Sequence, residues 1–187
     1  MKLWLVRHAQ PLIKPGLCYG QLDVAADAIA TQRAAQAISP LLPASATLYC
    51  SGLLRARQLA KAIHDQRKTL LPKIDVRLNE MNFGIWEGIA WDDIPKTAFD
   101  TWTADFDQHR FGGVEGVRDL LLRVHQALHA LPAVGDAIWI THAGVIRAVN
   151  YLERYGLETI ATPENWPNEA PAFGLWQCLE FGQLETR

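Results

Sequence analysis

The chain of 187 residues carries a formal net charge of −2, with 49% hydrophobic and 20% charged residues. This composition predicts a globular chain and excludes both intrinsic disorder and a general electrostatic attraction to nucleic acid. The length fits a single domain, residues 1–187, that buries ~70% of its unfolded surface.

The apolar run at the N-terminus is interrupted by Arg7, too early for a signal peptide, and no run approaches the ~20 residues of a membrane span. The three cysteines are widely spaced and form no CxxC pair. This spacing disfavours a disulfide framework and a structural zinc site, and it indicates a reducing compartment. We therefore expect a soluble, cytoplasmic protein.

Residues 3–6 predict a short buried strand that ends at Arg7 and His8, before Pro11. A helix is expected from near Asp27 to residue 37 or 38. Residues 47–50 have the β-branched and aromatic character of a second strand. Ser51 then follows as the expected N-cap of a helix with Arg55 in its first turn.

Residues 73–78 alternate in polarity and predict a third strand. Residues 83–113 are irregular and rich in aromatics, which predicts a lid or substrate-binding insertion of loops and short helices. A small satellite core of those aromatics is the alternative, and it is compatible with a lid.

The last third of the chain contains two more helices and two more strands. Helical spacing covers residues 117–131, residues 137–141 form a buried strand, and a helix runs from about Val145 to Gly156. Residues 173–181 are expected to form a final strand at the sheet edge. Alternating strands and helices predict a three-layer α/β sandwich with a mostly parallel central sheet.

Three of the predicted strands are followed by polar or charged residues. Arg7 and His8 follow the first, Ser51 and Arg55 the second, and His142 the fourth. Parallel strands would bring these ends to one edge of the sheet, where α/β proteins bind ligands. Arginines and histidines in one crevice need an anion between them, and a phosphoryl group matches the guanidinium geometry. The helix after His142 adds backbone N–H donors and its positive dipole end.

A neutral histidine is also a good nucleophile toward phosphorus, and a phosphohistidine divides one displacement into two easier steps. The leaving alkoxide needs a proton, for which Glu80, just past the third predicted strand, is the first candidate and Glu87 the second. A Ser/His/Asp triad is less favoured because the chain has no Gly-x-Ser-x-Gly elbow. The chain also lacks a Gly-x-x-x-x-Gly-Lys loop, which disfavours nucleoside triphosphate hydrolysis.

No metal and no cofactor are expected at this site, because a zinc ion held by His8 and His142 would lack an evident third ligand. His125 and His129 are four residues apart on a predicted helix, a spacing that a metal pair can use. They lie off the apolar face of that helix, which favours solvated surface histidines.

Four segments, in this order along the chain, resemble motifs of the histidine phosphatase superfamily, whose best-known branch is the cofactor-dependent phosphoglycerate mutases. They are Arg7-His8-Ala9 and residues 51–56, 78–88 and 141–144. The resemblance implies a phosphoglycerate mutase-like fold, with His8 phosphorylated and Glu80 as the proton donor. It places phosphoryl binding on Arg7, Arg55 and His142.

Residues 16–23 are similar to the α-ribazole phosphatase branch, which removes a 5′-phosphate late in cobalamin synthesis. The resemblance implies a small-molecule phosphomonoester as substrate. The net charge and the lack of a long apolar run lead us to expect no nucleic acid and no membrane partner. The substrate-binding residues that the resemblance points to are Tyr19, Gly20, Gln21, Ala143 and Gly144. Aromatic side chains that could enclose a flat, largely neutral leaving group are Tyr19, Trp86, Trp91, Trp102 and Phe106.

The chain departs from the family pattern in two places. Ala9 replaces the usual glycine, a change between small residues. Residues 111–116 resemble the family's Pro-Gly-Gly-Glu-Ser but lack its proline and serine and contain Val114 as an insertion. Two alternatives to hydrolysis remain open, namely phosphoglycerate mutase-type phosphoryl transfer and a non-catalytic module that binds a phosphorylated ligand.

Overall fold

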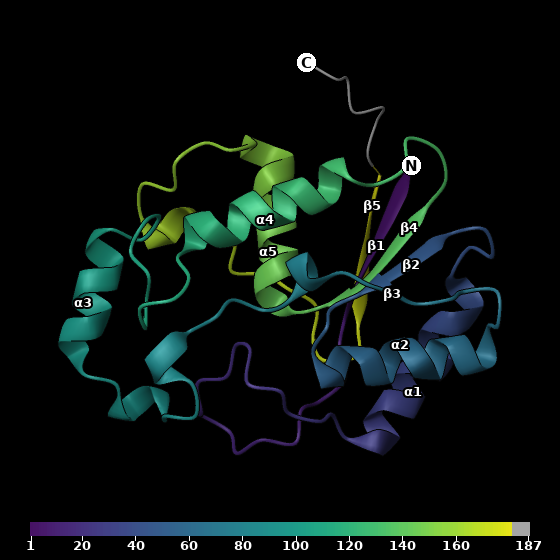
Figure 1. Ribbon diagram of the computed structural model, residues 1–187, viewed down its shortest axis with the longest axis horizontal. Helices are drawn as coiled ribbons and strands as arrows, with labels where there is room; N and C mark the ends of the chain where they lie inside the picture. Colours follow the sequence, from purple (N-terminus) through teal and green to yellow (C-terminus); the bar gives the residue numbers. More distant parts are fainter. Residues whose placement is uncertain (181–187) are drawn as a thin grey trace.

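The computed structural model describes residues 1–180, which form a five-stranded sheet in the order β3-β2-β4-β1-β5 (Figure 1). The strands are β1 (Lys2–Arg7), β2 (Thr47–Cys50), β3 (Lys73–Ile74), β4 (Ala137–Thr141) and β5 (Trp176–Glu180). β1, β2, β3 and β4 are parallel, while β5 pairs antiparallel with β1. The predicted α/β architecture with a mostly parallel sheet is confirmed.

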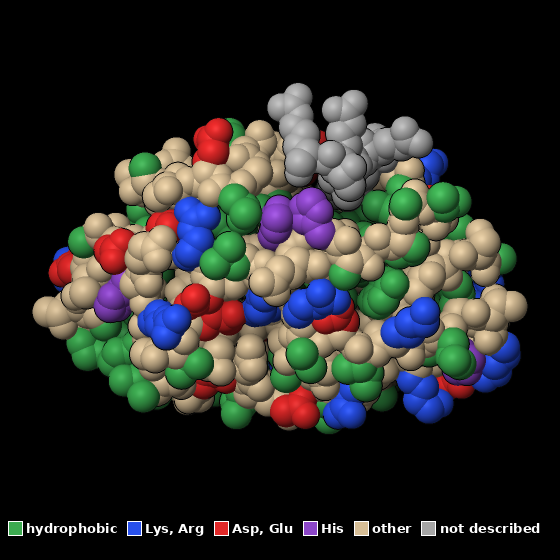
Figure 2. Space-filling model, turned by 45° about the horizontal axis from the view of Figure 1, so that its top comes forward, with side chains coloured by type: hydrophobic (Ala, Val, Ile, Leu, Met, Phe, Trp, Pro, Cys, Tyr) green, Lys and Arg blue, Asp and Glu red, His purple; other side chains and the backbone are tan. Residues whose placement is uncertain are grey.

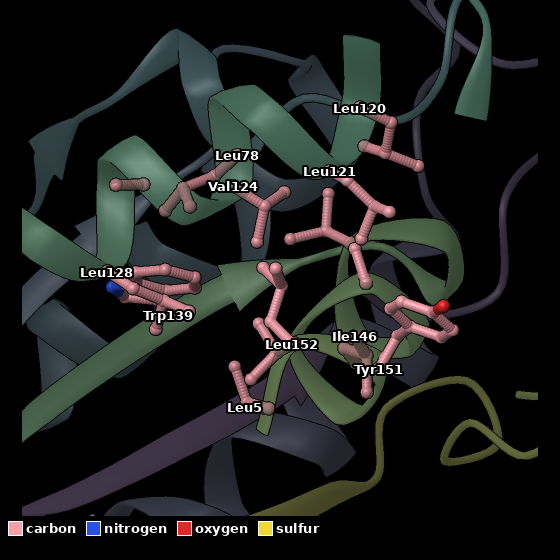
Figure 3. Packing of buried hydrophobic residues seen from close by; sticks show 14 of the residues in the cluster. Leu5, Leu78, Leu120, Leu121, Val124, Leu128, Trp139, Ile146, Tyr151 and Leu152 are labelled. Carbon is pink, nitrogen blue, oxygen red and sulfur yellow. The ribbon is translucent and has the colours of Figure 1, made fainter. Parts of the chain in front are cut away.

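Helices cover both faces of the sheet. Helices α1 (Ala28–Ile38) and α2 (Leu54–Gln66) pack on one face, and α4 (Val117–His129) and α5 (Ala143–Tyr155) on the other (Figure 1). Alternation along β1 explains the two-sided core, since successive side chains point to opposite faces. Leu5 packs among the side chains of α4 and α5 (Figure 3), whereas Val6 packs with those of α1 and α2.

Residues 83–113 lie beside the sheet rather than in its layers (Figure 1). They include helix α3 (Lys96–Ala104) and two 3₁₀ helices, Gly84–Trp86 and Trp91–Asp93. Their aromatic side chains surround the fully buried Phe111, with the Trp102 ring stacked 4.4 Å from it, centroid to centroid. Trp86, Trp91 and Phe99 also lie against this ring, so the segment has a small core of its own.

The predicted third strand over residues 73–78 is wrong in its second half. Only Lys73–Ile74 is a strand, and Val76–Leu78 is a 3₁₀ helix. The Asp75 carboxylate accepts the Arg77 N–H at 3.0 Å, and the Arg77 side chain returns to the same carboxylate. This local side-chain bonding replaces the strand pairing that the alternating pattern predicts.

The predicted N-cap of α2 is also wrong, because the N-cap residue is Leu53, whose side chain makes no capping hydrogen bond. Other boundaries differ by one to three residues. Helix α5 begins at Ala143, two residues before the expected start, and β5 begins at Trp176 instead of residue 173. β5 is an edge strand as expected, while the predicted strand end at Phe181 lies outside the described residues.

Two further 3₁₀ helices, Ser39–Leu41 and Pro163–Asn165, complete the regular structure of residues 1–180. Within these residues no helix has the length and apolar character needed to cross a membrane. Acidic and basic side chains are interspersed over the face of the molecule shown in Figure 2.

Candidate active site

The carboxyl ends of β1, β2 and β4 meet at one edge of the sheet, as the parallel order requires. The His8 N–H bonds to Thr141 O at 3.0 Å, and the Ser51 N–H bonds to Ile140 O at 3.0 Å. The imidazole rings of His8 and His142 lie 5.0 Å apart between centroids. Residues that the sequence separates widely therefore form one buried cluster.

His8 is held as a neutral imidazole with its lone pair on Nε2. Its Nδ1 lies 2.7 Å from Ala9 O, an acceptor only, so the ring proton is on Nδ1. Its Nε2 accepts an N–H from Arg55 Nε at 3.3 Å. Burial, helped by the Arg55 charge, lowers the pKa of His8 to about 3. The ring is therefore uncharged at neutral pH, as a nucleophile must be.

Arg55, on the first turn of α2, is fully buried beside His8. Its Nη2 donates to Gly20 O at 2.6 Å and its Nη1 to Leu22 O at 3.0 Å. The guanidinium also lies near the Tyr19 ring, 5.4 Å from its centre. Arg55 thus ties the loop of residues 19–22 to the nucleophile.

Arg7 approaches the site from the end of β1. Its Nη1 donates to Pro171 O at 3.0 Å, and its guanidinium carbon lies 3.9 Å from the centre of the Phe173 ring. The Nε of Arg7 is buried and has no hydrogen-bond partner. Burial lowers the pKa of Arg7, and the positive charge of Arg147 on α5 adds to this effect.

His142 immediately precedes α5 and is completely buried. Its Nε2 lies 2.8 Å from Ser51 Oγ, and its Nδ1 is a second buried nitrogen without a partner. The pKa of His142 is well below its usual value because of burial, with further contributions from nearby positive charges.

Glu80 lies against the N-terminus of α5. Its Oε1 accepts the Met81 N–H at 3.0 Å and its Oε2 accepts the Gly144 N–H at 3.1 Å. Glycine at position 144 leaves room for this contact, because a Cβ there would collide with Glu80 Oε1. Burial lowers the pKa of both Arg7 and Arg55, and the negative charge of Glu80 partly offsets this lowering, which places Glu80 within electrostatic reach of the cluster.

Glu87 has a different set of contacts. Its Oε1 accepts N–H groups from Gln21 at 2.8 Å and Phe83 at 3.0 Å, and its Oε2 accepts the Leu22 N–H. Three backbone donors on one carboxylate fasten the 19–22 loop to the start of the aromatic segment. Glu87 therefore serves as a structural anchor for the loop.

The remaining residues expected to bind substrate lie around this cluster. Gly20 packs so tightly that a Cβ would collide with Met81 O, and Gln21 Nε2 donates to Glu80 O at 3.1 Å. Ala143 and Gly144 form the first turn of α5 next to His142.

Sequence reasoning missed four residues that shape the site. Asn79 Oδ1 accepts both the Ser51 hydroxyl and the Gly52 N–H, and the Phe173 ring lies 5.4 Å from the His8 ring. Arg123 on α4 donates to the backbone carbonyls of residues 77, 79 and 80, and it pairs with Glu115 at 2.6 Å. The polar residue Asn79, next to the candidate acid Glu80, could have been predicted as a site residue, but no feature of the sequence indicates that Phe173 lies at the site.

The other histidines lie outside the cluster. His125 and His129 are paired with each other on α4, Nε2 to Nε2 at 2.9 Å, and His64 Nδ1 contacts Leu70 O. Within residues 1–180, no three His, Cys, Asp or Glu side chains gather where they could hold a metal ion.

A buried histidine between two arginines at the carboxyl edge of an α/β sheet defines a protein that handles an oxyanion. The chain matches the family model of the histidine phosphatase superfamily, branch 1, over residues 3–168. The protein belongs to this branch.

Known structures share the fold. The structure of TTHB049 from Thermus thermophilus is 28% identical, covers 98% of this chain and 95% of its own, and superimposes with a TM-score of 0.71. A mycobacterial glucosyl-3-phosphoglycerate phosphatase is 23% identical, with 81% and 79% of the two chains covered and a TM-score of 0.69. The latter likeness concerns the fold alone. No curated protein matches the chain in sequence.

Proposed function

We propose that the protein is a phosphomonoesterase that acts through a phosphohistidine on His8, without a metal ion. The lone pair of His8 Nε2 attacks phosphorus and the ester oxygen leaves; water then attacks the phosphohistidine and releases inorganic phosphate. Family membership supports phosphoryl transfer, and the neutral, oriented imidazole of His8 supports its role as nucleophile.

The observation that carries this proposal is the pair of unsatisfied nitrogens beside His8. Arg7 Nε and His142 Nδ1 are buried without a partner, although buried polar atoms are nearly always hydrogen-bonded. A phosphoryl group on His8 would supply acceptor oxygens to Arg7 Nε–H and, once the His142 ring is protonated, to His142 Nδ1–H. The charges of the half-buried Arg7 and the buried Arg55 would stabilise the negative charge of the transition state.

We assign the proton donor to Glu80. Each of its oxygens accepts one backbone N–H, which leaves further lone pairs available for a proton. Glu87 is already engaged by three backbone N–H groups, which fasten its carboxylate to the 19–22 loop and to Phe83. Glu80 protonates the departing alkoxide and then accepts a proton from the attacking water.

The proposed substrate is a phosphomonoester with a flat, largely neutral leaving group, such as α-ribazole 5′-phosphate. The Phe173 ring lies beside the nucleophile His8 and the Tyr19 ring lies beside Arg55, and both rings are partly exposed. Trp91 and Trp102 face Phe111 in the aromatic core, so Tyr19 and Phe173 replace them as the proposed stacking partners. Cobalamin synthesis, cytoplasmic location and the lack of nucleic acid or membrane partners remain predictions.

Turnover of a panel of phosphomonoesters in excess EDTA tests the reaction class, with the His8→Ala variant as the blank. We expect activity that chelation leaves unchanged and that the variant lacks. Activity lost on chelation, or absent with every small phosphoester, contradicts the proposal. A sugar phosphate or 3-phosphoglycerate preferred tenfold over α-ribazole phosphate, about 1.4 kcal/mol in kcat/KM, would remove the substrate assignment alone.

A further inference from the structure

A chain of hydrogen bonds runs from the partly buried Asn79 through Ser51 to His142. Asn79 Oδ1 lies 2.8 Å from the Gly52 nitrogen and 2.9 Å from Ser51 Oγ. Ser51 Oγ accepts the Leu53 N–H at 3.1 Å and lies 2.8 Å from His142 Nε2. Ser51 and His142 are both completely buried, so water does not compete for these contacts.

The proton positions in this chain follow from donor and acceptor counting. The Gly52 N–H needs an acceptor, which identifies the nearby Asn79 atom as the amide oxygen. The single hydroxyl proton of Ser51 then goes to Asn79 Oδ1. Ser51 Oγ has none left for the ring, so His142 Nε2 must carry a proton and donate it to Ser51.

A neutral imidazole has one N–H, so His142 Nδ1 is left with a bare lone pair. This is the buried nitrogen that has no partner in the structure. A lone pair repels the oxygens of an anion, and the neutral ring therefore cannot assist phosphoryl binding in this tautomer. Only the imidazolium form has a donor on both nitrogens.

We propose that His142 takes up one proton when an oxyanion binds, and that Asn79 and Ser51 impose this coupling by fixing the tautomer. The inference rests on the phosphoryl site proposed above. Asn79 and Ser51 are positioning residues that act through His142.

The charges around His142 agree with such a switch. The pKa of His142 is lowered by burial and by neighbouring groups that carry or can carry positive charge. The groups are His8 and Arg7 at the carboxyl end of β1, Arg55 on α2 and Arg123 on α4, of which the three arginines are charged at neutral pH. The Glu80 carboxylate accepts the Gly144 N–H in the first turn of α5. A bound dianion reverses the local charge and makes the imidazolium form favourable.

Sulfate is the appropriate probe because its own charge does not change near neutral pH. Isothermal titration calorimetry in two buffers of different ionisation enthalpy measures the protons taken up. We expect about one proton per sulfate bound at neutral pH, and an association constant that falls about tenfold per pH unit above neutrality. Imidazole ¹⁵N shifts should show the Nε2–H tautomer of His142 in the free protein and protonation of both nitrogens with sulfate.

Variants locate the proton and test the two positioning residues. Asn79→Ala frees the Ser51 hydroxyl to donate to His142 Nε2, and Ser51→Ala removes the acceptor of Nε2–H. Either change allows the Nδ1–H tautomer, so sulfate binding should lose most of its pH dependence. The His8→Asn variant should keep the dependence and His142→Asn should lose it, while Asn150→Ala, on the far part of α5, serves as the matched control.

The outcomes separate this inference from the proposed function. Binding without proton uptake, or a pH dependence that disappears only in His8→Asn, overturns the inference and leaves the phosphoryl site intact. A pH dependence unchanged in both Asn79→Ala and Ser51→Ala overturns the role of the two residues. Failure of sulfate to bind at any pH contradicts the phosphoryl site itself, and the inference fails with it.

Discussion

The proposed general acid is Glu80 and not Glu87, and the substrate dependence of a Glu80 variant tests this assignment. Replacing Glu80 with Gln should slow hydrolysis of an alkyl phosphate by about a hundredfold or more. The effect on p-nitrophenyl phosphate should be much smaller, because its leaving oxygen needs little protonation. Steady-state kinetics on both substrates measures the ratio. Equal losses on the two would remove Glu80 from the acid role.

The Glu87→Gln variant is the matched comparison. It weakens the anchoring of the 19–22 loop by backbone N–H groups, so it should affect both substrates alike. A leaving-group dependence in Glu87→Gln and none in Glu80→Gln would reverse the assignment of the two carboxylates.

Gly144 offers a second way to displace the proposed acid without changing its chemistry. A Cβ at this position would collide with Glu80 Oε1, the end of a flexible side chain that can move aside. Gly144→Ala should therefore reproduce the leaving-group dependence of Glu80→Gln while the melting temperature changes little. Thermal unfolding and kinetics on the two substrates test this, and an unchanged rate on alkyl phosphates would show that the position of Glu80 is not critical.

At the scale of elements, one side chain of α4 holds the turn that carries Asn79 and Glu80. Arg123 and its partner Glu115 are largely buried, and Arg123 also donates to three backbone carbonyls of this turn. Arg123→Ala leaves a buried carboxylate and several carbonyls without donors. We expect it to reduce the free energy of unfolding by about 3 kcal/mol, measured by urea denaturation.

Arg110→Ala is the control for this prediction. Arg110 pairs with Asp119 at 2.9 Å on the surface of the same region, where its side chain is 59% exposed. An exposed ion pair contributes less than about 1 kcal/mol. Similar losses in the two variants would mean that the anchoring of the 77–80 turn has no special importance.

The elements whose local signals agree with their packing were predictable. Asp27 was expected at the start of a helix, and its carboxylate indeed accepts the Ala30 N–H as the N-cap of α1. The buried runs at residues 3–6 and 137–141 became the paired central strands, which is why His8 and His142 meet. The full strand over residues 73–78 and the N-cap at Ser51 failed as predictions, because the Asp75 and Ser51 side chains bond to partners that the sequence pattern does not reveal.

The same distinction applies to the site. His8, Arg7, Arg55 and His142 stand at strand ends or one turn beyond, so sheet topology alone brings them together. Phe173 and Arg123 reach the site from a distant loop and from a helix on one face of the sheet, through contacts that no periodicity encodes. The role of residues 111–116 was equally hidden, since Glu115 pairs with Arg123 within the protein.

At the scale of the whole molecule, two buried neutral histidines make folding sensitive to acid. Below about pH 6.5 the unfolded chain protonates both residues, whereas burial keeps His8 and His142 uncharged in the folded protein. The unfolded state then binds more protons, so the free energy of unfolding decreases as pH falls. For His8 this loss continues until its folded pKa of about 3 is reached.

The expected loss is about 1.4 kcal/mol per histidine for each pH unit below 6.5. Urea denaturation at several pH values measures it. His8→Asn or His142→Asn should each reduce the slope of unfolding free energy against pH by the contribution of one histidine. His109→Asn, outside the site, is the control. A wild-type slope in both site variants would show that these rings are not the source of the acid sensitivity.

Two of the three guanidinium nitrogens of Arg55 already have carbonyl partners in the resting protein, Gly20 O and Leu22 O. A phosphoryl group that binds to these nitrogens must replace the existing hydrogen bonds. The binding free energy it gains there is therefore only the difference between the new hydrogen bonds and the existing ones. The departing inorganic phosphate faces the same competition from the loop. In the proposed reaction the resting loop therefore hinders saturation of the site by free phosphate, and product inhibition is expected to be weak.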